Sequence, residues 1–140
     1  SVAAQESGPE GIFFNPDGSK MYIIGSEGDD VNEYDLSIAW DVSSATYLQN
    51  FSVAAQESGP EGIFFNPDGT KMFIVGSTAD SVNEYDLSTA WDVSSATYLQ
   101  VFSWPKYWEI NPQGIFFKPD GNKMYIVGAN TDSVYVYDLT

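Results

Sequence analysis

The sequence predicts an all-β protein assembled from repeated units of four short strands, and three observations lead to this class. Residues 1–50 align without gaps on residues 52–101, and 42 of these 50 positions are identical. A third copy, residues 114–140, matches residues 62–88 at 18 of 27 positions. Short apolar runs are separated by turn residues, and they show no helical period.

The second copy shows the first two strands of one unit. Residues 62–65 form an apolar strand, and the turn Asn-Pro-Asp-Gly follows at residues 66–69. Pro and Gly stand there at positions that tight turns favour. Residues 71–76 are apolar at both odd and even positions, which predicts a strand covered on both faces.

Two further strands complete the unit. Residues 82–87 form the third strand, and a longer connection, residues 88–95, leads to the fourth at residues 96–102. In that connection Trp91, like Trp40 in the first copy, is expected to cap the outer edge of its unit, with the following Asp fixing the turn. Alternation in the fourth strand predicts that one face carries Ala96, Tyr98, Gln100 and Phe102.

A period near 50 residues with four strands per unit is typical of a β-propeller blade. The chain resembles YVTN- and NHL-like β-propellers, in which a PDG-x-K turn joins the inner strand to a MYIVG strand and a V-x-x-YDL strand follows. The resemblance rests on the string GIFFNPDGTKMFIVGSTADSVNEYDLS and covers nearly the whole chain. It implies a fold and little about function, since propellers host many unrelated activities.

The resemblance implies blades at about residues 11–53, 62–104 and 114–140, the third truncated and without its outer strand. A blade buries both faces against its neighbours, so three blades alone would leave two apolar faces in water. Propellers usually close with about four to eight blades. We therefore expect a ring closed by oligomerisation, or a fragment of a longer chain. Two copies of the chain, giving six blades, are preferred, and three copies would give nine.

Composition restricts the chemistry and the partners. The 140 residues include 20 Asp and Glu against five Lys, with no Arg, His or Cys, and the formal net charge is −15. Cys and His nucleophiles, His general bases and ordinary zinc sites are therefore excluded. Such an acidic surface repels nucleic acid and anionic lipid, so we expect no nucleic-acid partner and no membrane partner.

Acidic residues recur in the third strand of each unit and in the loop before it. Carboxylates and loop carbonyls there could hold Ca²⁺, which takes about six to eight oxygen ligands. Asp29, Asp80 and Asp132 are the first candidates for such a metal site. The alternative is a solvated acidic face whose Asp side chains close turns, with no cofactor bound.

The connection before the third copy departs from the repeat. Where the first two copies have SVAAQESGPEG, this segment carries Trp104, Lys106, Tyr107 and Trp108. Aromatic side chains on loops are common in sugar sites and protein hot spots, so these four are the candidate ligand-binding residues. The alternative is that the two tryptophans pack against an adjoining blade or a partner chain.

No enzyme is expected, because the acidic residues recur once per blade and catalysis needs one asymmetric site. The chain is expected to be a non-enzymatic binding or scaffold protein. In its sharper form it is an extracellular or cell-surface binder of carbohydrate or another ligand, whose repeated loops act together. The alternative is a purely structural, self-assembling unit, amplified or engineered, without a ligand.

Overall fold

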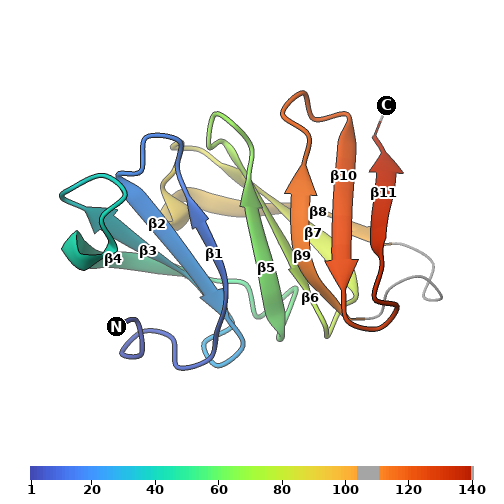
Figure 1. The fold of residues 1–140 in the computed structure, drawn as a ribbon, viewed down its shortest axis with the longest axis horizontal. Helices are drawn as coiled ribbons and strands as arrows, with labels where there is room; N and C mark the ends of the chain where they lie inside the picture. The colour runs from blue at the N-terminus through green and yellow to red at the C-terminus, as the bar shows by residue number, and fades with distance from the viewer. Residues whose placement is uncertain (104–110, 140) are drawn as a thin grey trace.

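Three antiparallel β-sheets make up the computed structural model, which describes residues 1–103 and 111–139. We call them sheets I, II and III, and they follow one another from left to right in Figure 1. Sheet I contains β1 (Pro9–Phe14), β2 (Lys20–Gly25), β3 (Asp30–Leu36) and β4 (Ala45–Ser52). Sheet II contains β5 (Pro60–Phe65), β6 (Lys71–Gly76), β7 (Ser81–Leu87) and β8 (Ala96–Ser103). Sheet III contains β9 (Pro112–Phe117), β10 (Lys123–Gly128) and β11 (Val134–Asp138).

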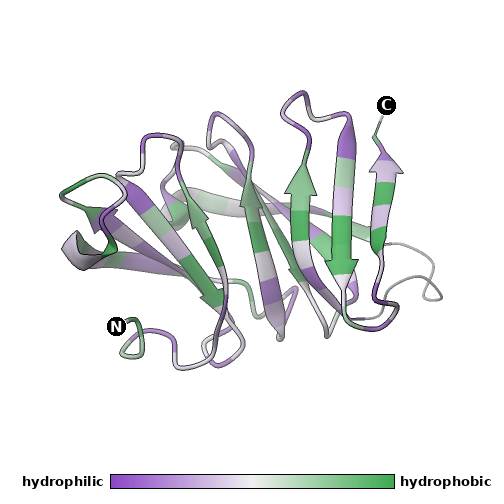
Figure 2. Ribbon diagram, viewed as in Figure 1, coloured by the Kyte–Doolittle hydropathy of each residue, from purple (hydrophilic) through white to green (hydrophobic). Residues whose placement is uncertain are grey.

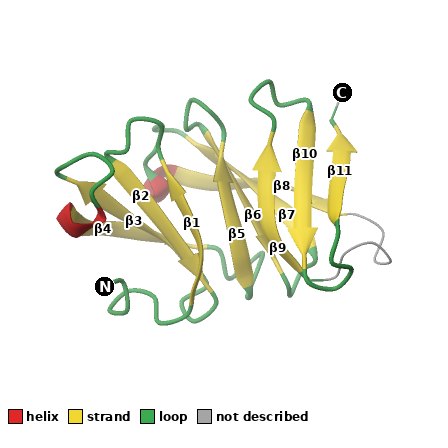
Figure 3. Ribbon diagram, viewed as in Figure 1, coloured by secondary structure: helices red, strands yellow, loops and turns green. Residues whose placement is uncertain are grey.

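Strands pair in chain order within each sheet, so the chain completes one meander before it starts the next. The all-β class and the four-stranded unit are therefore confirmed. Two short 3₁₀ turns, η1 (Val42–Ser44) and η2 (Val93–Ser95), precede the outermost strands β4 and β8 (Figure 3). Asp41 and Asp92 cap them by accepting hydrogen bonds from the backbone N–H groups two residues later. No helix in the described ranges is long and apolar enough to cross a bilayer.

The innermost strands β1, β5 and β9 lie next to one another (Figure 1). A Cβ atom added to Gly11 on β1 would lie 2.7 Å from the Glu61 carbonyl oxygen on β5. One added to Gly62 on β5 would lie 2.8 Å from the Gln113 carbonyl oxygen on β9. Both glycines are required because neighbouring backbones approach closer than a side chain allows.

A β-bulge divides the fourth strand of sheet II. The register between β7 and β8 shifts between Glu84 and Tyr85. As a result the Tyr98 ring contacts Tyr85, on the face toward sheet I, whereas Gln100 donates a hydrogen bond to Glu84 on the opposite face. The predicted alternation, with all four alternate residues on one face, is wrong because the extra residue reverses the direction of the side chains that follow.

Apolar residues recur along the strands of all three sheets (Figure 2), and a cluster of buried apolar side chains lies in each gap between sheets. Between sheets I and II, Tyr22 and Ile24 pack on Phe65 and Ile74. A second cluster lies between sheets II and III, and a third covers the face of sheet I that points away from sheet II. Each gap is therefore the shared core of two neighbouring sheets.

Candidate functional site

A lysine with two carboxylates forms a recurring ion-paired group. In sheet I, Lys20 on β2 lies opposite Asp35 on β3, and Glu33 stands two residues earlier on the same face. The Lys20 Nζ atom lies 2.5 Å from Glu33 Oε1 and 2.8 Å from Asp35 Oδ1. Partial burial opposes the charged form, but hydrogen bonds to Asp35 and Glu33 outweigh it and raise the pKa of Lys20. The ammonium is therefore a fixed cation at neutral pH.

Sheet II repeats the same group. The Lys71 Nζ atom lies 2.5 Å from Glu84 Oε1 and 2.9 Å from Asp86 Oδ1. The other oxygen of Glu84 accepts a hydrogen bond from Gln100 Nε2 at 2.6 Å. Burial again opposes the charge on Lys71 and hydrogen bonds to the two carboxylates again raise its pKa. The ion-paired groups of sheets I and II therefore consist of the same three residue types, and they differ in the residues that surround them.

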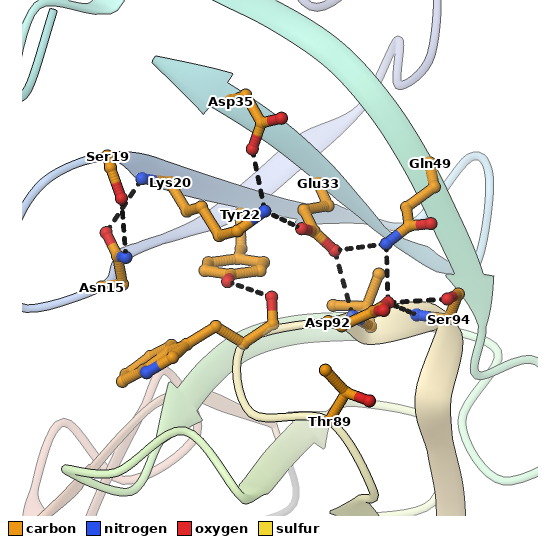
Figure 4. Close-up of polar contacts among 12 residues, drawn as sticks. Asn15, Ser19, Lys20, Tyr22, Glu33, Asp35, Gln49, Thr89, Asp92 and Ser94 are labelled. Atoms are coloured by element: carbon orange, nitrogen blue, oxygen red, sulfur yellow. Dashed lines mark hydrogen bonds and ion pairs between the residues drawn. The ribbon is translucent and has the colours of Figure 1, made fainter. Parts of the chain in front are cut away.

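In the gap between sheets I and II, this group is covered by residues 91–93, which we call the inter-sheet turn (Figure 4). Glu33 Oε2 accepts hydrogen bonds from the Val93 backbone N–H at 3.0 Å and from Gln49 Nε2 at 2.9 Å. Gln49 also donates to Asp92 Oδ1 at 2.7 Å. Both oxygens of the Glu33 carboxylate are therefore bound by other groups of the protein, and Glu33 has a structural role.

Trp91 fills the rest of this gap. Its ring lies 5.5 Å from the Phe65 ring and 6.4 Å from the Phe13 ring, centre to centre. The Tyr22 hydroxyl donates a hydrogen bond of 2.7 Å to the Trp91 carbonyl oxygen. The prediction that Trp91 caps the outer edge of its unit is wrong, because its ring is inserted between two sheets. The turn glycine Gly69, at φ +72°, leaves the space that the indole occupies.

The matching gap between sheets II and III holds an open pocket of about 510 Å³. Among the described residues, none takes the place of Trp91: a Cβ added to Gly69 would lie 2.3 Å from the indole, whereas one on Gly121 would meet no atom within 4 Å. The sheet II wall is formed by Phe64, Lys71, Phe73, Glu84 and Gln100.

The two gaps differ in how far they expose the equivalent carboxylates, Glu33 and Glu84. The Glu33 side chain is 1% exposed, and the Glu84 side chain is 15% exposed. The same residue type in the same ion pair is thus sealed in one gap and accessible in the other. Within residues 1–103 and 111–139, the pocket therefore makes the surroundings of Glu84 chemically different from those of Glu33.

Sheet III adds a second ion pair to the pocket. Lys118 stands where the first two copies have Asn, and its Nζ atom lies 2.5 Å from Asp120 Oδ2. The hydrogen bond from Lys118 is the main cause that lowers the pKa of Asp120. The pocket lining thus contains two ion pairs, Lys71 with Glu84 on sheet II and Lys118 with Asp120 on sheet III, and it has no excess of positive charge. Such a lining favours a polar ligand without net charge.

The candidate calcium residues take equivalent places in three separate sheets. Asp29, Asp80 and Asp132 all lie in the turn after the second strand, with φ of 50°, 50° and 52°. No group of three or more Asp and Glu within residues 1–103 and 111–139 is arranged to hold a metal ion. The structure thus gives these residues a turn geometry and does not bring them together. Ca²⁺ binding by them stays a prediction.

The predicted ligand-binding residues Trp104, Lys106, Tyr107 and Trp108 lie outside the described residues. Their role stays a prediction. The pocket was missed by the sequence reasoning, although a signal was available. Strands 71–76 and 82–87 form a hairpin in which Lys71 falls opposite Asp86, beside Glu84. Pairing across this hairpin could have revealed the ion-paired group, but not which gap leaves it open.

No family model matches the chain, and no curated protein matches it. Solved structures do. A protein from Bacteroides fragilis, provisionally named 6-phosphogluconolactonase, superposes with a TM-score of 0.70 at 19% identity, covering 94% of this chain and 35% of that one. The β-propeller domain of Cps50 (Swd1) from Myceliophteria thermophila gives a TM-score of 0.65 at 11% identity, covering 92% and 37%. This chain has the β-propeller fold. It spans about a third of the length of these similar structures.

A third similar structure has the name of an enzyme. The periplasmic gluconolactonase PpgL of Pseudomonas aeruginosa has a TM-score of 0.68 at 18% identity, covering 94% of this chain and 36% of that one. Proteins named as lactonases thus share this propeller arrangement. They overturn the expectation of a non-enzymatic binding or scaffold protein, and with it the exclusion of an enzyme. Among the described residues the two gaps also differ, because Trp91 occupies one of them and the other holds a pocket.

Proposed function

We propose that this propeller chain belongs to an enzyme that hydrolyses the lactone of a sugar acid, with the pocket between sheets II and III as the substrate site. The observation that carries the proposal is the Glu84 carboxylate, held between Lys71 and Gln100 on the wall of an open pocket. The lactonase names of similar structures support the substrate class.

The residues of the pocket suit the addition of water to an ester carbonyl. Glu84 takes a proton from water as the water oxygen bonds to the lactone carbonyl carbon. The carbonyl oxygen gains the electron pair, and the Lys71 ammonium stabilises the resulting oxyanion. When the carbonyl re-forms, the ring C–O bond breaks and the leaving oxygen takes the proton back from Glu84. The product is an open-chain hydroxy acid.

A neutral lactone fits better than a phosphorylated one. The four charged side chains of the pocket cancel, so no excess positive charge awaits a phosphate. The net charge of −15 also repels a dianionic substrate during its approach. Phe64, Phe73 and Phe117 line the same pocket and offer ring faces to the C–H groups of a sugar.

The test is the hydrolysis of glucono-1,5-lactone, followed as acid release in a pH-stat and corrected for the spontaneous rate. Glu84→Gln removes the base and should lower kcat at least about a hundredfold, the usual contribution of a general base. Glu33→Gln is the matched control, because it makes the same change in the filled gap. It should lower stability but leave the rate per folded molecule unchanged.

Two outcomes would contradict the proposal. One is wild-type protein that releases acid no faster than buffer alone. The other is equal loss of activity in Glu84→Gln and Glu33→Gln at equal folded fractions, since the effect would then come from the ion-paired group as a structural element. A faster rate with the 6-phosphorylated lactone than with the neutral one would overturn the choice of substrate.

A further inference from the structure

The strands of sheet III are rich in apolar residues (Figure 2), and several of these residues are exposed on the side away from sheet II. Phe116 is 54% exposed and Val127 is 46% exposed. Their matches in sheet II, Phe64 and Val75, are 9% and 0% exposed because sheet III covers them. We call this surface the leading face; its other members are Tyr125, Val134 and Val136.

Sheet I exposes the complementary surface at the other end of the molecule. Ile12 is 56% exposed, whereas its match Ile63 in sheet II is 6% exposed beneath sheet I. Val42 is 60% exposed, whereas its match Val93 is fully buried in the inter-sheet turn. Trp40, the counterpart of the inserted Trp91, is likewise exposed. We call this surface the trailing face.

These two free faces are the two halves of an interface that the chain already forms between sheets I and II. We propose that the leading face of one copy packs on the trailing face of a second copy, head to tail. By analogy with Phe13, which lies 5.3 Å from Phe65 and 6.4 Å from Trp91, Phe116 would pack on Phe14 and Trp40 of the second copy. This assembly is independent of the proposed reaction.

One substitution between the repeats supports this occupant. In the filled gap, the Tyr22 hydroxyl donates a hydrogen bond to the Trp91 carbonyl oxygen. The open gap has Phe73 at that position, where none of the described residues forms an equivalent turn, whereas the leading face again has Tyr125. The hydroxyl is thus present where a turn is bound and where we propose that one docks. The Tyr125 hydroxyl would donate to the Trp40 carbonyl oxygen of the second copy.

The innermost strand of sheet III, β9, likewise has no neighbouring sheet on the side away from sheet II among the described residues. Gly11 and Gly62 each abut the backbone of the next sheet, whereas a Cβ on Gly114 would meet only Val127, in its own sheet. Position 136 changes in the direction expected for a more apolar contact, since Val136 stands where Glu33 and Glu84 stand in the other sheets. Head-to-tail contacts form rings when the rotation closes. Two copies would place six sheets in one ring, within the usual range of propellers.

The assembly is tested by light scattering coupled to size exclusion at two protein concentrations. We expect a discrete dimer, at about twice the chain mass of 15.4 kDa. Phe116→Glu on the leading face and Ile12→Glu on the trailing face should each yield monomers, because each puts a charge into an apolar contact. Leu99→Glu, on the outermost strand β8 and outside both faces, is the control and should remain dimeric.

Mixing the two monomeric variants makes the test specific for head-to-tail packing. Phe116→Glu retains an intact trailing face and Ile12→Glu an intact leading face, so an equimolar mixture should form a heterodimer through one contact. Packing of like faces predicts instead that one variant stays dimeric alone. Circular dichroism of each variant shows whether it folds, which both should, since the changed side chains are exposed in the single chain.

Tyr125→Phe should weaken dimerisation by about tenfold to a hundredfold, because a closed ring of two copies has two such contacts and loses one hydrogen bond in each. Phe73→Tyr is its control and should leave the dimer unchanged, because residue 73 lies within the gap between sheets II and III. A wild-type monomer at both concentrations would overturn the proposal. So would a failure of the mixed variants to associate while both are folded.

Discussion

Glu57 is a fully buried carboxylate whose contacts assign it a structural task. One of its oxygens accepts hydrogen bonds from the Gly59 N–H at 2.8 Å and the Thr78 N–H at 3.1 Å, and the other accepts from the Ala79 N–H at 3.0 Å. The side chain thereby fastens the loop before β5 to the turn between β6 and β7. Glu6 makes similar contacts in the first repeat. An acidic residue in this chain is therefore not a catalytic candidate merely because it is buried.

Glu57→Gln should reduce the free energy of unfolding by about 2 kcal/mol, because a side-chain NH₂ would then face backbone donors in a buried site. Urea denaturation measures the change. Glu10→Gln, at an exposed position on β1, is the control and should have little effect. If both substitutions were neutral, the three backbone contacts would not hold the loop as the structure indicates.

At the scale of elements, the two 3₁₀ turns show how neighbours change the role of one sequence. Residues 40–45 and 91–96 have the same amino acids, and each turn is capped by its Asp. Only Asp92 also accepts a hydrogen bond from the preceding sheet, through Gln49. The second turn therefore joins two sheets, whereas the first packs only on its own.

Asp92→Ala should reduce the free energy of unfolding by about 1–2 kcal/mol, the range for a lost cap. Asp41→Ala should cost less, because Asp41 has no partner on another sheet among the described residues. Urea denaturation of both variants at pH 7 gives the comparison. Equal losses would show that the bond to Gln49 adds nothing.

The effect of Asp92 should also depend on pH. The Ser94 hydroxyl is the largest contributor that lowers the pKa of Asp92, and Gln49 adds to it. Because the folded pKa lies below the unfolded value of about 3.9, the carboxylate stabilises the fold above that pH. This contribution is lost as the pH falls through the folded pKa. The difference between wild type and Asp92→Ala should therefore shrink below about pH 4.

At the scale of the whole molecule, charge repulsion competes with local ion pairs. The net charge is −15, while Lys20 and Lys71 are each held between two carboxylates. Salt screens the repulsion, which extends over the whole exposed surface, but it screens the partly buried pairs with Glu33 and Glu84 much less. Repulsion should therefore dominate the response to salt.

Raising NaCl from 0.02 M to 0.5 M at pH 7 should increase Tm by roughly 3 °C, which corresponds to about 1 kcal/mol for a chain of this size. Differential scanning calorimetry at constant protein concentration measures the shift, and sucrose at matched osmolality is the control for excluded solute. A fall in Tm with NaCl would mean that the ion pairs of Lys20 and Lys71 outweigh the general repulsion.

Much of the fold could be predicted because the repeat presents the same local signals more than once. The strand predicted at residues 71–76 is β6. The turn Asn-Pro-Asp-Gly of the first two copies, which is Lys-Pro-Asp-Gly in the third, has its glycine at positive φ in each copy. The bulge opposite Glu84 and Tyr85 was missed, since one inserted residue leaves no mark in an exposed strand in which polar and apolar residues are mixed. The candidate site was missed because the space between two sheets depends on how their side chains meet, which the pattern within one repeat does not show.

The sequence alone determined the all-β class, the four-stranded unit and the absence of thiol and imidazole chemistry, because these follow from local patterns and composition. The tertiary structure decided which copy of a repeated residue is sealed and which is accessible. Glu33 and Glu84 have the same neighbours along the chain, yet only Glu33 is covered by the inter-sheet turn. Burial depends on what lies across the gap, and a repeated sequence does not encode that difference locally.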